Sequence, residues 1–267
     1  MTSRRNFVKN TISLLATLGI VSPLQASINE VGDLQANNDL NFNADEDLAR
    51  ISVLLKGKDP VKWVFTGDSI TQGAKHTFGF RSYQEIFAER VRWELGRVRD
   101  IVVNSAISGN TSRDILGDYE WRVAQFTPNI VSNMIGTNDV SIKKEISIDD
   151  FRKNNIALIS RIRSTGSIPI LHTPNSIIVE KATGRERFAA YVNVTREVAD
   201  EKKVILIDHY AYWNDEIKKI SKEQLYSKWM NDELHPNGYG HSQLAQLLFK
   251  KLSIFDENAF TCRDLNK

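Results

Sequence analysis

Five short apolar segments alternate with longer amphipathic segments along the chain. Runs of this length are typical of buried strands in a parallel sheet. The five segments are Val61–Thr66, Ile101–Asn104, Ile130–Ile135, Ile168–His172 and Val204–Ile207. Between them, stretches such as Tyr83–Leu95 and Ile148–Arg163 place apolar residues on one face of a helix, and Tyr239–Leu252 forms a last such pattern. The alternation predicts an α/β fold in the order βαβαβαβαβα.

The predicted elements follow one another through short connections, which favours a single domain over residues 46–255. Residues 27–45 are rich in Asn, Asp and Glu, and are predicted to form a polar spacer or an arm on the domain surface. Residues 256–267 are predicted to be a tail. The single cysteine, Cys262, lies in this tail, so no intramolecular disulfide can form.

The amino terminus has the pattern of an export signal. Residues 1–26 contain a basic start with the pair Arg4-Arg5, an apolar stretch, and small residues before the predicted cleavage site. The arginine pair favours the twin-arginine type. The apolar stretch is shorter than the roughly 20 residues that span a bilayer. We therefore predict a periplasmic or extracellular protein without stable membrane insertion after signal cleavage, the alternative being an uncleaved or lipid-retained form.

Composition excludes few classes of function. The apolar fraction of 41% and the charged fraction of 25% are ordinary for a globular protein. The net charge is +2, and the Lys and Arg residues are scattered among acids. This pattern does not predict nucleic-acid binding.

The first predicted strand ends in a serine at a strand-to-helix turn, within Gly67-Asp68-Ser69. A residue at such a turn is presented at the rim of the sheet, where a nucleophile is accessible. Far along the chain, Asp232 and His235 lie three residues apart, so that one short turn would hold the carboxylate against the imidazole. These residues predict a serine hydrolase.

Four polar segments lie at or beyond the carboxyl ends of predicted strands, which meet at one edge of a parallel sheet. They are Gly67-Asp68-Ser69, Ile107-Ser108-Gly109-Asn110, Gly136-Thr137-Asn138-Asp139 and Asp232-Glu233-Leu234-His235. In this order and spacing they resemble the SGNH or GDSL hydrolase family over residues 61–250. The resemblance implies a three-layer α/β/α sandwich around a flavodoxin-like, five-stranded parallel sheet.

The resemblance also implies roles for five residues. Ser69 would be the nucleophile, His235 the general base, and Asp232 the acid that orients the imidazole. The backbone N–H groups of Ser69 and Gly109 and the side-chain amide of Asn138 would form the oxyanion hole. These roles agree with the chemistry of acyl transfer, because a tetrahedral oxyanion needs donors placed before reaction and glycine allows close approach of the backbone.

Other polar residues near these segments receive weaker assignments. His76, Asn110 and Thr173 are predicted to bind substrate. For His172 two interpretations stay open, a residue that lines the substrate pocket or a polar residue at its rim. Asp68 and Asp139 are predicted to hold turns or cap helices. His241 is predicted to be a packed or capping histidine.

The sequence implies no cofactor and no metal, because it contains no metal-ligand spacing and no phosphate-binding loop. The polar loops after the strands favour a small acyl group, most of all acetyl on a carbohydrate, so the expected partner is a small-molecule or polysaccharide ester. The alternative is a lysophospholipase or thioesterase that acts on lipid or acyl thioesters. A non-catalytic glycan-binding protein is a third interpretation. The pattern predicts nothing about the oligomeric state.

Overall fold

A parallel sheet of five strands lies at the centre of the protein. The computed structural model describes residues 42–73 and 75–263, so the predicted signal and most of the predicted spacer lie outside the described residues. The strands are β1 (Lys62–Gly67), β2 (Ile101–Asn104), β3 (Ile130–Met134), β4 (Ile168–Thr173) and β5 (Ile205–Asp208). Their order in the sheet is β2-β1-β3-β4-β5, the predicted flavodoxin-like arrangement.

Both faces of the sheet are apolar because helices cover both. Along β1, Trp63 and Phe65 point to one core cluster while Val64 points to the other. All three are at most 1% exposed. Val64 lies beside Val103 of β2 and Val131 of β3, which places branched side chains side by side on one face. Because both faces of the strands are buried, the strands appear in the sequence as continuous apolar runs.

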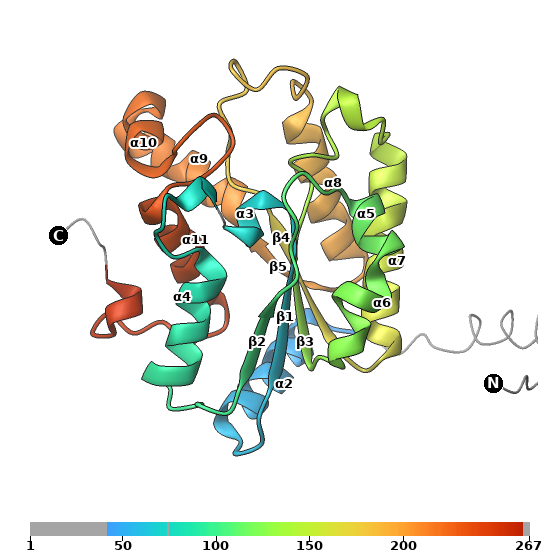
Figure 1. Ribbon diagram of the computed structural model, residues 1–267, viewed down its shortest axis with the longest axis vertical. Helices are drawn as coiled ribbons and strands as arrows, with labels where there is room; N and C mark the ends of the chain where they lie inside the picture. Colours follow the sequence, from blue (N-terminus) through green and yellow to red (C-terminus); the bar gives the residue numbers. More distant parts are fainter. Residues whose placement is uncertain (1–41, 74, 264–267) are drawn as a thin grey trace, which may run out of the picture. The chain divides into compact units, whose positions relative to one another are not determined.

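Two groups of helices sandwich the sheet (Figure 1). One group comprises α2 (Ala44–Lys56), α4 (Tyr83–Glu89), α9 (His209–Ile220), α10 (Lys222–Trp229) and α11 (Gly238–Lys251). The other comprises α5 (Ser112–Gly117), α6 (Tyr119–Arg122), α7 (Ile148–Ser164) and α8 (Phe188–Glu201). The predicted three-layer fold is therefore confirmed. Among the described residues, no helix has the length and apolarity needed to cross a membrane.

Short helical turns complete the chain. They are α3 (Ser69–Gln72), the π-helical turn η2 (Arg90–Glu94), and the 3-10 turns η1 (Lys75–Thr77), η3 (Ala124–Phe126), η4 (Ile142–Lys144) and η5 (Phe260–Cys262). The predicted Tyr83–Leu95 helix is thus α4 continued by η2. The helices α5 and α7 begin at polar caps, where the side chains of Thr111 and Ser147 accept hydrogen bonds from the first turn.

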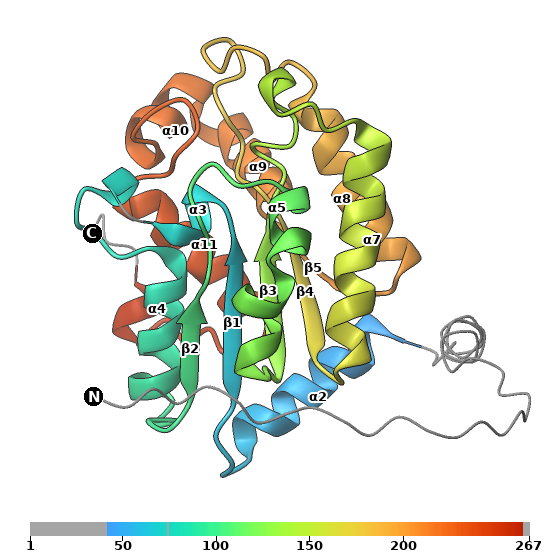
Figure 2. The same cartoon turned by 45° about the vertical axis from the view of Figure 1, so that its right-hand side comes forward.

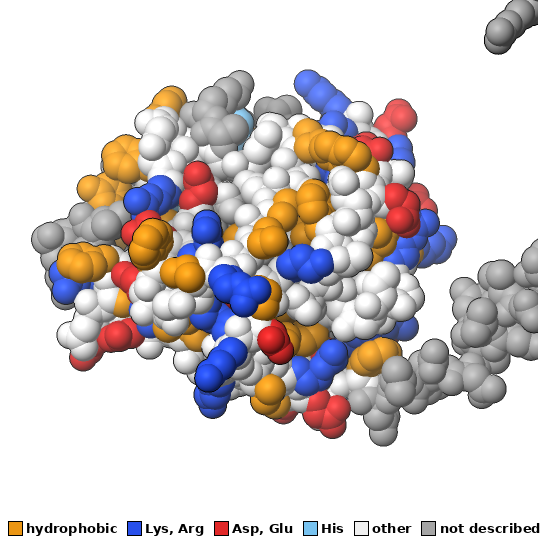
Figure 3. Space-filling view, turned by 60° about the horizontal axis from the view of Figure 1, so that its bottom comes forward, with side chains coloured by type: hydrophobic (Ala, Val, Ile, Leu, Met, Phe, Trp, Pro, Cys, Tyr) orange, Lys and Arg blue, Asp and Glu red, His pale blue; other side chains and the backbone are white. Residues whose placement is uncertain are grey.

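The carboxyl ends of the strands point to one end of the sheet, where α3 follows β1 (Figures 1 and 2). All four strand pairings are parallel, so the loops that follow the strands converge there. The opposite end is the face seen in Figure 3, where basic, acidic and apolar side chains are intermixed. The candidate chemistry therefore belongs to the end that carries α3.

Residues 256–263, which were predicted to belong to a tail, are packed against the domain. Cys262 is 3% exposed and belongs to the core cluster that includes α11. The backbone N–H of Thr261 donates to the Glu94 carboxylate at 3.1 Å. The domain thus extends beyond the predicted boundary at 255, because the buried Thr261 and Cys262 of η5 pack beside α4 and α11.

Candidate active site

Ser69 begins α3, and a single residue, Asp68, separates it from the end of β1. At Gly67, φ is +153°, and a Cβ would lie 2.2 Å from the Met134 carbonyl oxygen. Only glycine fits this turn without displacing β3. Asp68 caps α3, since its carboxylate accepts a hydrogen bond from the Ile70 N–H at 3.0 Å. The strand-to-helix turn expected from the sequence is present, and Asp68 makes the expected cap.

Asp68 and Asp139 are buried acids that organise the loops beneath the nucleophile. Burial raises the pKa of Asp68 to about 7 despite the Ile70 hydrogen bond, and the charge of Asp139 raises it further. Burial also raises the pKa of Asp139 to about 6. Asp139 accepts hydrogen bonds from the backbone N–H and the hydroxyl of Ser112 at 2.9 and 2.5 Å. These bonds fasten the loop after β3 to the start of α5.

A chain of hydrogen bonds joins Ser69, His235 and Asp232. The Ser69 Oγ lies 2.8 Å from His235 Nε2. On the other side of the ring, Nδ1 lies 2.9 and 2.8 Å from the two carboxylate oxygens of Asp232. An ionised carboxylate only accepts hydrogen bonds, so Nδ1 carries the proton and Nε2 is free to accept the serine proton. The geometry is that of a nucleophile, a base and an orienting acid.

The loop that carries this acid and base is ordered by its own backbone. One oxygen of Asp232 accepts hydrogen bonds from the N–H groups of Leu234 and His235, both at 2.8 Å. Partial burial alone would raise the pKa of Asp232, but these two bonds and the His235 ring outweigh burial and lower it. Asp232 therefore stays ionised over the neutral range, which keeps the imidazole in the orientation described above.

Gly109 and Asn138 lie on the loops after β2 and β3. Gly109 has a φ of +79°, and a Cβ there would meet no atom within 4 Å. Glycine is therefore required by its backbone conformation, and not by crowding within the protein. The Asn138 amide nitrogen donates to the Asn110 carbonyl at 3.1 Å. This bond holds the amide in place.

Arg185 supports Asn138 from the long segment between β4 and α8. Its Nε donates to the Thr137 carbonyl at 2.9 Å, and a terminal nitrogen lies 3.5 Å from the Asn138 side-chain oxygen. Burial lowers the pKa of Arg185, while the charges of Glu233 and Asp68 act in the opposite direction. The sequence analysis missed this residue, because nothing in the pattern around a single arginine in a loop indicates its tertiary contacts.

The comparisons with known proteins can now be set beside this geometry. The model of the GDSL-like lipase/acylhydrolase family matches residues 65–243. That range holds all four polar segments and exceeds half of the chain. The chain belongs to this family. It is accordingly a carboxylic ester hydrolase.

Individual relatives agree with this assignment. An acetylxylan esterase from Geobacillus stearothermophilus is 29% identical over 210 residues, which cover 72% of this chain and 94% of the relative. In structure, the protein is similar to Axe2, an acetylxylan esterase from the same organism, with a TM-score of 0.61, 24% identity and coverage of 76% and 96% of the two chains. It is also similar to a GDSL-like lipase from Parabacteroides merdae, with a TM-score of 0.64, 18% identity and coverage of 73% and 97%. These two structural matches bear on the fold.

Thr173 and His172 differ from what the sequence predicted for them. Thr173 is fully buried, and its hydroxyl donates to Asp208 at 3.0 Å and accepts from the Tyr210 N–H at 2.9 Å. It holds the end of β4 to the start of α9, so it does not face a substrate. His172 is 1% exposed and bonds to Ser132 and His209 inside the core. It is neither a pocket residue nor a rim residue.

The remaining weaker assignments have structural counterparts. His241 is buried, and its Nδ1 accepts the Tyr83 N–H at 3.2 Å, which is the packed role expected for it. The Asn110 side-chain oxygen accepts a hydrogen bond from the Arg122 guanidinium, while its carbonyl holds Asn138. Asn110 is thus engaged in shaping the oxyanion region, and contact with substrate stays a prediction.

His76 lies directly against His235. The two imidazole rings are stacked, with centroids 3.5 Å apart and planes inclined by 10°. His76 Nδ1 is 3.9 Å from Asp232. Donor atoms of His76, Asp232 and His235 lie within 4.8 Å of one another, as ligands of a metal ion would. Nitrogen lone pairs in two parallel stacked rings do not converge on one point, so this cluster is shaped for contact between the rings and not for a metal.

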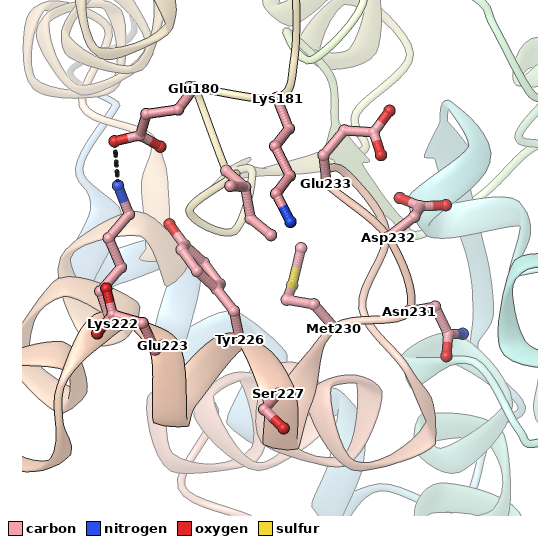
Figure 4. Close-up of a pocket in the computed structure, with 11 residues that line it drawn as sticks. Glu180, Lys181, Lys222, Glu223, Tyr226, Ser227, Met230, Asn231, Asp232 and Glu233 are labelled. Carbon is pink, nitrogen blue, oxygen red and sulfur yellow. Dashed lines mark hydrogen bonds and ion pairs between the residues drawn. The ribbon is translucent and has the colours of Figure 1, made fainter.

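Two hollows flank the proposed catalytic loop, which comprises residues 231–235. One, of about 690 Å³, is bordered by Asp232 and Glu233 and by residues of α10. Figure 4 shows Lys181 and Met230 pointing into it, with the Lys222–Glu180 ion pair across its far side. The other, of about 390 Å³, is lined by Thr77, Phe78, Phe80, Asn231, Asn237, Gly238 and Tyr239. Phe78 and Phe80 are 76% and 64% exposed, so the loop after Ser69 is less polar than the sequence analysis supposed.

Proposed function

We propose that this ester hydrolase removes short acyl groups, acetyl above all, from carbohydrate through an acyl-enzyme on Ser69. The observation that carries the proposal is the hydrogen-bonded series from Ser69 through His235 to Asp232, with distances of 2.8 Å on each side of the imidazole. The carbohydrate part is supported by the acetylxylan esterase relative and by the exposed aromatic rings beside the catalytic loop.

In the first half of the reaction, the Ser69 oxygen attacks the ester carbonyl carbon while His235 Nε2 takes the serine proton. The oxyanion that forms accepts hydrogen bonds from the N–H groups of Ser69 and Gly109 and from the Asn138 amide. The carbon–oxygen bond to the sugar then breaks. The leaving alkoxide takes the proton from His235 and departs as the alcohol, and the acyl group stays on Ser69.

In the second half, water attacks the acyl carbon and gives one proton to His235. Collapse of the second tetrahedral intermediate returns that proton to Ser69 and releases the carboxylic acid. Asp232 remains ionised throughout and stabilises the transient imidazolium. Each turnover thus consumes one water and one ester, and yields one acid and one alcohol.

The groove beside the catalytic loop offers two kinds of contact. Rings of Phe78, Phe80 and Tyr239 would pack on the apolar face of a sugar, with the amide groups of Asn231 and Asn237 nearby. The same rings would also bury an acyl chain, and this observation favours the second candidate, a lipid or thioester hydrolase. The two candidates place different parts of the substrate in the groove.

A comparison of substrates separates the candidates. We expect kcat/KM for p-nitrophenyl esters to fall steeply from C2 to C8, and acetate to be released from acetylated xylo-oligosaccharides. In Phe78→Ala, KM for the oligosaccharide ester should rise, whereas turnover of p-nitrophenyl acetate should stay unchanged. A maximum at C6 or longer, with the loss in Phe78→Ala confined to long acyl chains, would instead establish the lipid or thioester activity.

Export is a separate part of the proposal and rests on residues 1–26. We propose that the chain crosses the inner membrane by the twin-arginine route and acts in the periplasm or outside the cell. Replacing Arg4 and Arg5 by lysines should leave the precursor in the cytoplasm, as judged by fractionation and immunoblotting. Unchanged export would point to the general secretory route.

A further inference from the structure

The stacked pair of histidines is not needed by the mechanism as written. Ser69, His235 and Asp232 already supply the nucleophile, the base and its orienting acid. Yet His76 presents the face of its ring to His235 at 3.5 Å between centroids. Its side chain is 16% exposed and that of His235 is 12% exposed, so each ring shields the other from water.

The position of His76 depends on the catalytic loop itself. The side-chain amide of Asn231, the residue before Asp232, donates a hydrogen bond to the His76 carbonyl. The Asn231 N–H in turn donates to the His235 carbonyl at 2.8 Å. The short turn η1 and the catalytic loop are therefore joined through Asn231, whose side chain bonds to His76 and whose backbone bonds to His235.

We propose that His76 is a positioning residue for the catalytic base, holding the His235 ring in the plane that reaches Ser69 and facing the imidazolium formed in the transition state. The inference rests on the proposed roles of Ser69 and His235. It assigns to His76 a different role from the substrate binding expected from the sequence, because the ring face that would meet a substrate is turned to the base.

The contact between the two rings should stabilise the transition state more than the ground state. When His235 takes the serine proton, a positive charge develops between the Asp232 carboxylate and the face of the His76 ring. An aromatic face attracts a cation, and such contacts correspond to roughly 2- to 30-fold in an equilibrium or a rate. The attraction exists only after proton transfer, so it acts on kcat more than on KM.

Asp232 and His241 are ionisable groups that lie near the stacked pair. Asp232 faces both rings from the catalytic loop, and His241 faces them from α11. Burial lowers the pKa of His241 to about 3, so His241 adds no positive charge near neutral pH. A second proton on the stacked pair would place two positive charges within 4 Å of each other. The single negative charge of Asp232 would offset only one of them.

The test is a set of substitutions at His76, assayed with p-nitrophenyl acetate from pH 5 to 9. This substrate has no sugar, so the result does not depend on the carbohydrate assignment. In His76→Ala, kcat should fall by about 3- to 30-fold while KM stays within about twofold. The acid midpoint of the kcat/KM profile should fall by about half a pH unit, because the imidazolium loses its facing ring.

His76→Phe is the conservative variant. It keeps an aromatic face against His235 but neither titrates nor forms hydrogen bonds, so it should restore kcat to within about threefold of the wild type and restore the acid midpoint. His76→Gln keeps size and polarity without a ring, and should behave like His76→Ala. Trp93→Ala removes an exposed ring, 75% accessible, from η2 and serves as the control that should change nothing.

Three results would overturn the proposal. Unchanged kcat in both His76→Ala and His76→Gln would show that the ring contributes nothing to the base. A raised KM with kcat maintained would assign His76 to substrate binding. A larger loss in His76→Phe than in His76→Gln would assign it a hydrogen-bonding role. Thermal unfolding of each variant shows whether the fold is kept, and activity that persists in Ser69→Ala would refute the proposed function itself.

Discussion

His76 and His235 lie beside Asp232 with side chains 16% and 12% exposed, whereas His172, His209 and His241 are at most 1% exposed. The buried three are held by the core. His172 bonds to Ser132 at 2.8 Å and to His209 at 2.9 Å, and His241 accepts the Tyr83 N–H at 3.2 Å. The same side chain is therefore proposed to transfer protons at the edge of the sheet, and it makes hydrogen bonds within the core.

Solvation is the physical difference between the two groups. Burial lowers the pKa of His172 and His241 to about 3, and it lowers the pKa of His209 well below its ordinary value, with the charge of His172 acting in the same direction. An imidazole that cannot be charged near neutral pH cannot be a general base there. His235 instead has the Asp232 carboxylate at one ring nitrogen and the Ser69 hydroxyl at the other.

The largest expected effect comes from removing the proposed nucleophile, Ser69, or the proposed base, His235. Ser69→Ala and His235→Ala should each lower kcat by more than about 10³-fold, because either change removes the nucleophile–base pair. Unfolding temperature should change little. A fluorophosphonate probe should label the wild type and leave Ser69→Ala unlabelled. Labelling of that variant would place the nucleophile elsewhere.

Asp232→Asn tests whether orientation of the ring depends on the acid. The new amide would keep an oxygen for the N–H groups of Leu234 and His235, so the loop should stay folded. Its nitrogen, however, would donate to Nδ1 and leave a hydrogen on Nε2, facing Ser69. We expect kcat to fall by about 10²- to 10⁴-fold with unchanged stability. A loss below tenfold would mean that another group orients His235.

Asn138→Ala should lower kcat by about 10²- to 10³-fold with little change in KM, since one oxyanion donor is lost. Arg185→Ala should give a smaller loss of the same kind, because the Asn138 amide keeps its bond to Asn110 but loses a support. Steady-state kinetics on p-nitrophenyl acetate measure both. If KM rises and kcat holds, Asn138 binds substrate and does not stabilise the transition state.

The buried histidines should affect stability and leave kcat almost unchanged. The folded pKa of His241, about 3, lies below the unfolded value of about 6.5. The unfolded chain therefore binds a proton that the folded chain refuses, and stability is full above pH 6.5 and lost as the pH falls toward 3. At pH 5 this loss amounts to about 2 kcal/mol for one histidine.

His241→Gln isolates this contribution, because the glutamine oxygen can accept the Tyr83 N–H without titrating. Urea unfolding at pH 8 and pH 5 should show about 2 kcal/mol less acid destabilisation in the variant than in the wild type. Asp68 and Asp139, whose raised pKa values act in the opposite direction, are present in both proteins and cancel. An identical acid dependence of the two proteins would show that His241 is not buried neutral in solution.

The sequence alone determined the sheet, and it predicted the three residues of the hydrogen-bonded series, because both depend on short-range features. Each predicted strand agrees with an observed strand to within one residue at either end, since a continuous apolar run of this length is stable only between two layers of helices. Ser69, Asp232 and His235 were also identifiable, because the turn after β1 and the three-residue spacing of the acid and base are local.

Tertiary structure decided the roles of residues whose environment is made by distant segments. His76 and His172 both follow strands or lie near their ends, yet one meets His235 and the other meets Ser132 and His209. Thr173 is buried by contacts with Asp208 and Tyr210, and Arg185 reaches Thr137 across 48 positions of sequence. Burial and charge at a site are sums over neighbours brought together by folding, so a linear pattern of residue types does not contain them.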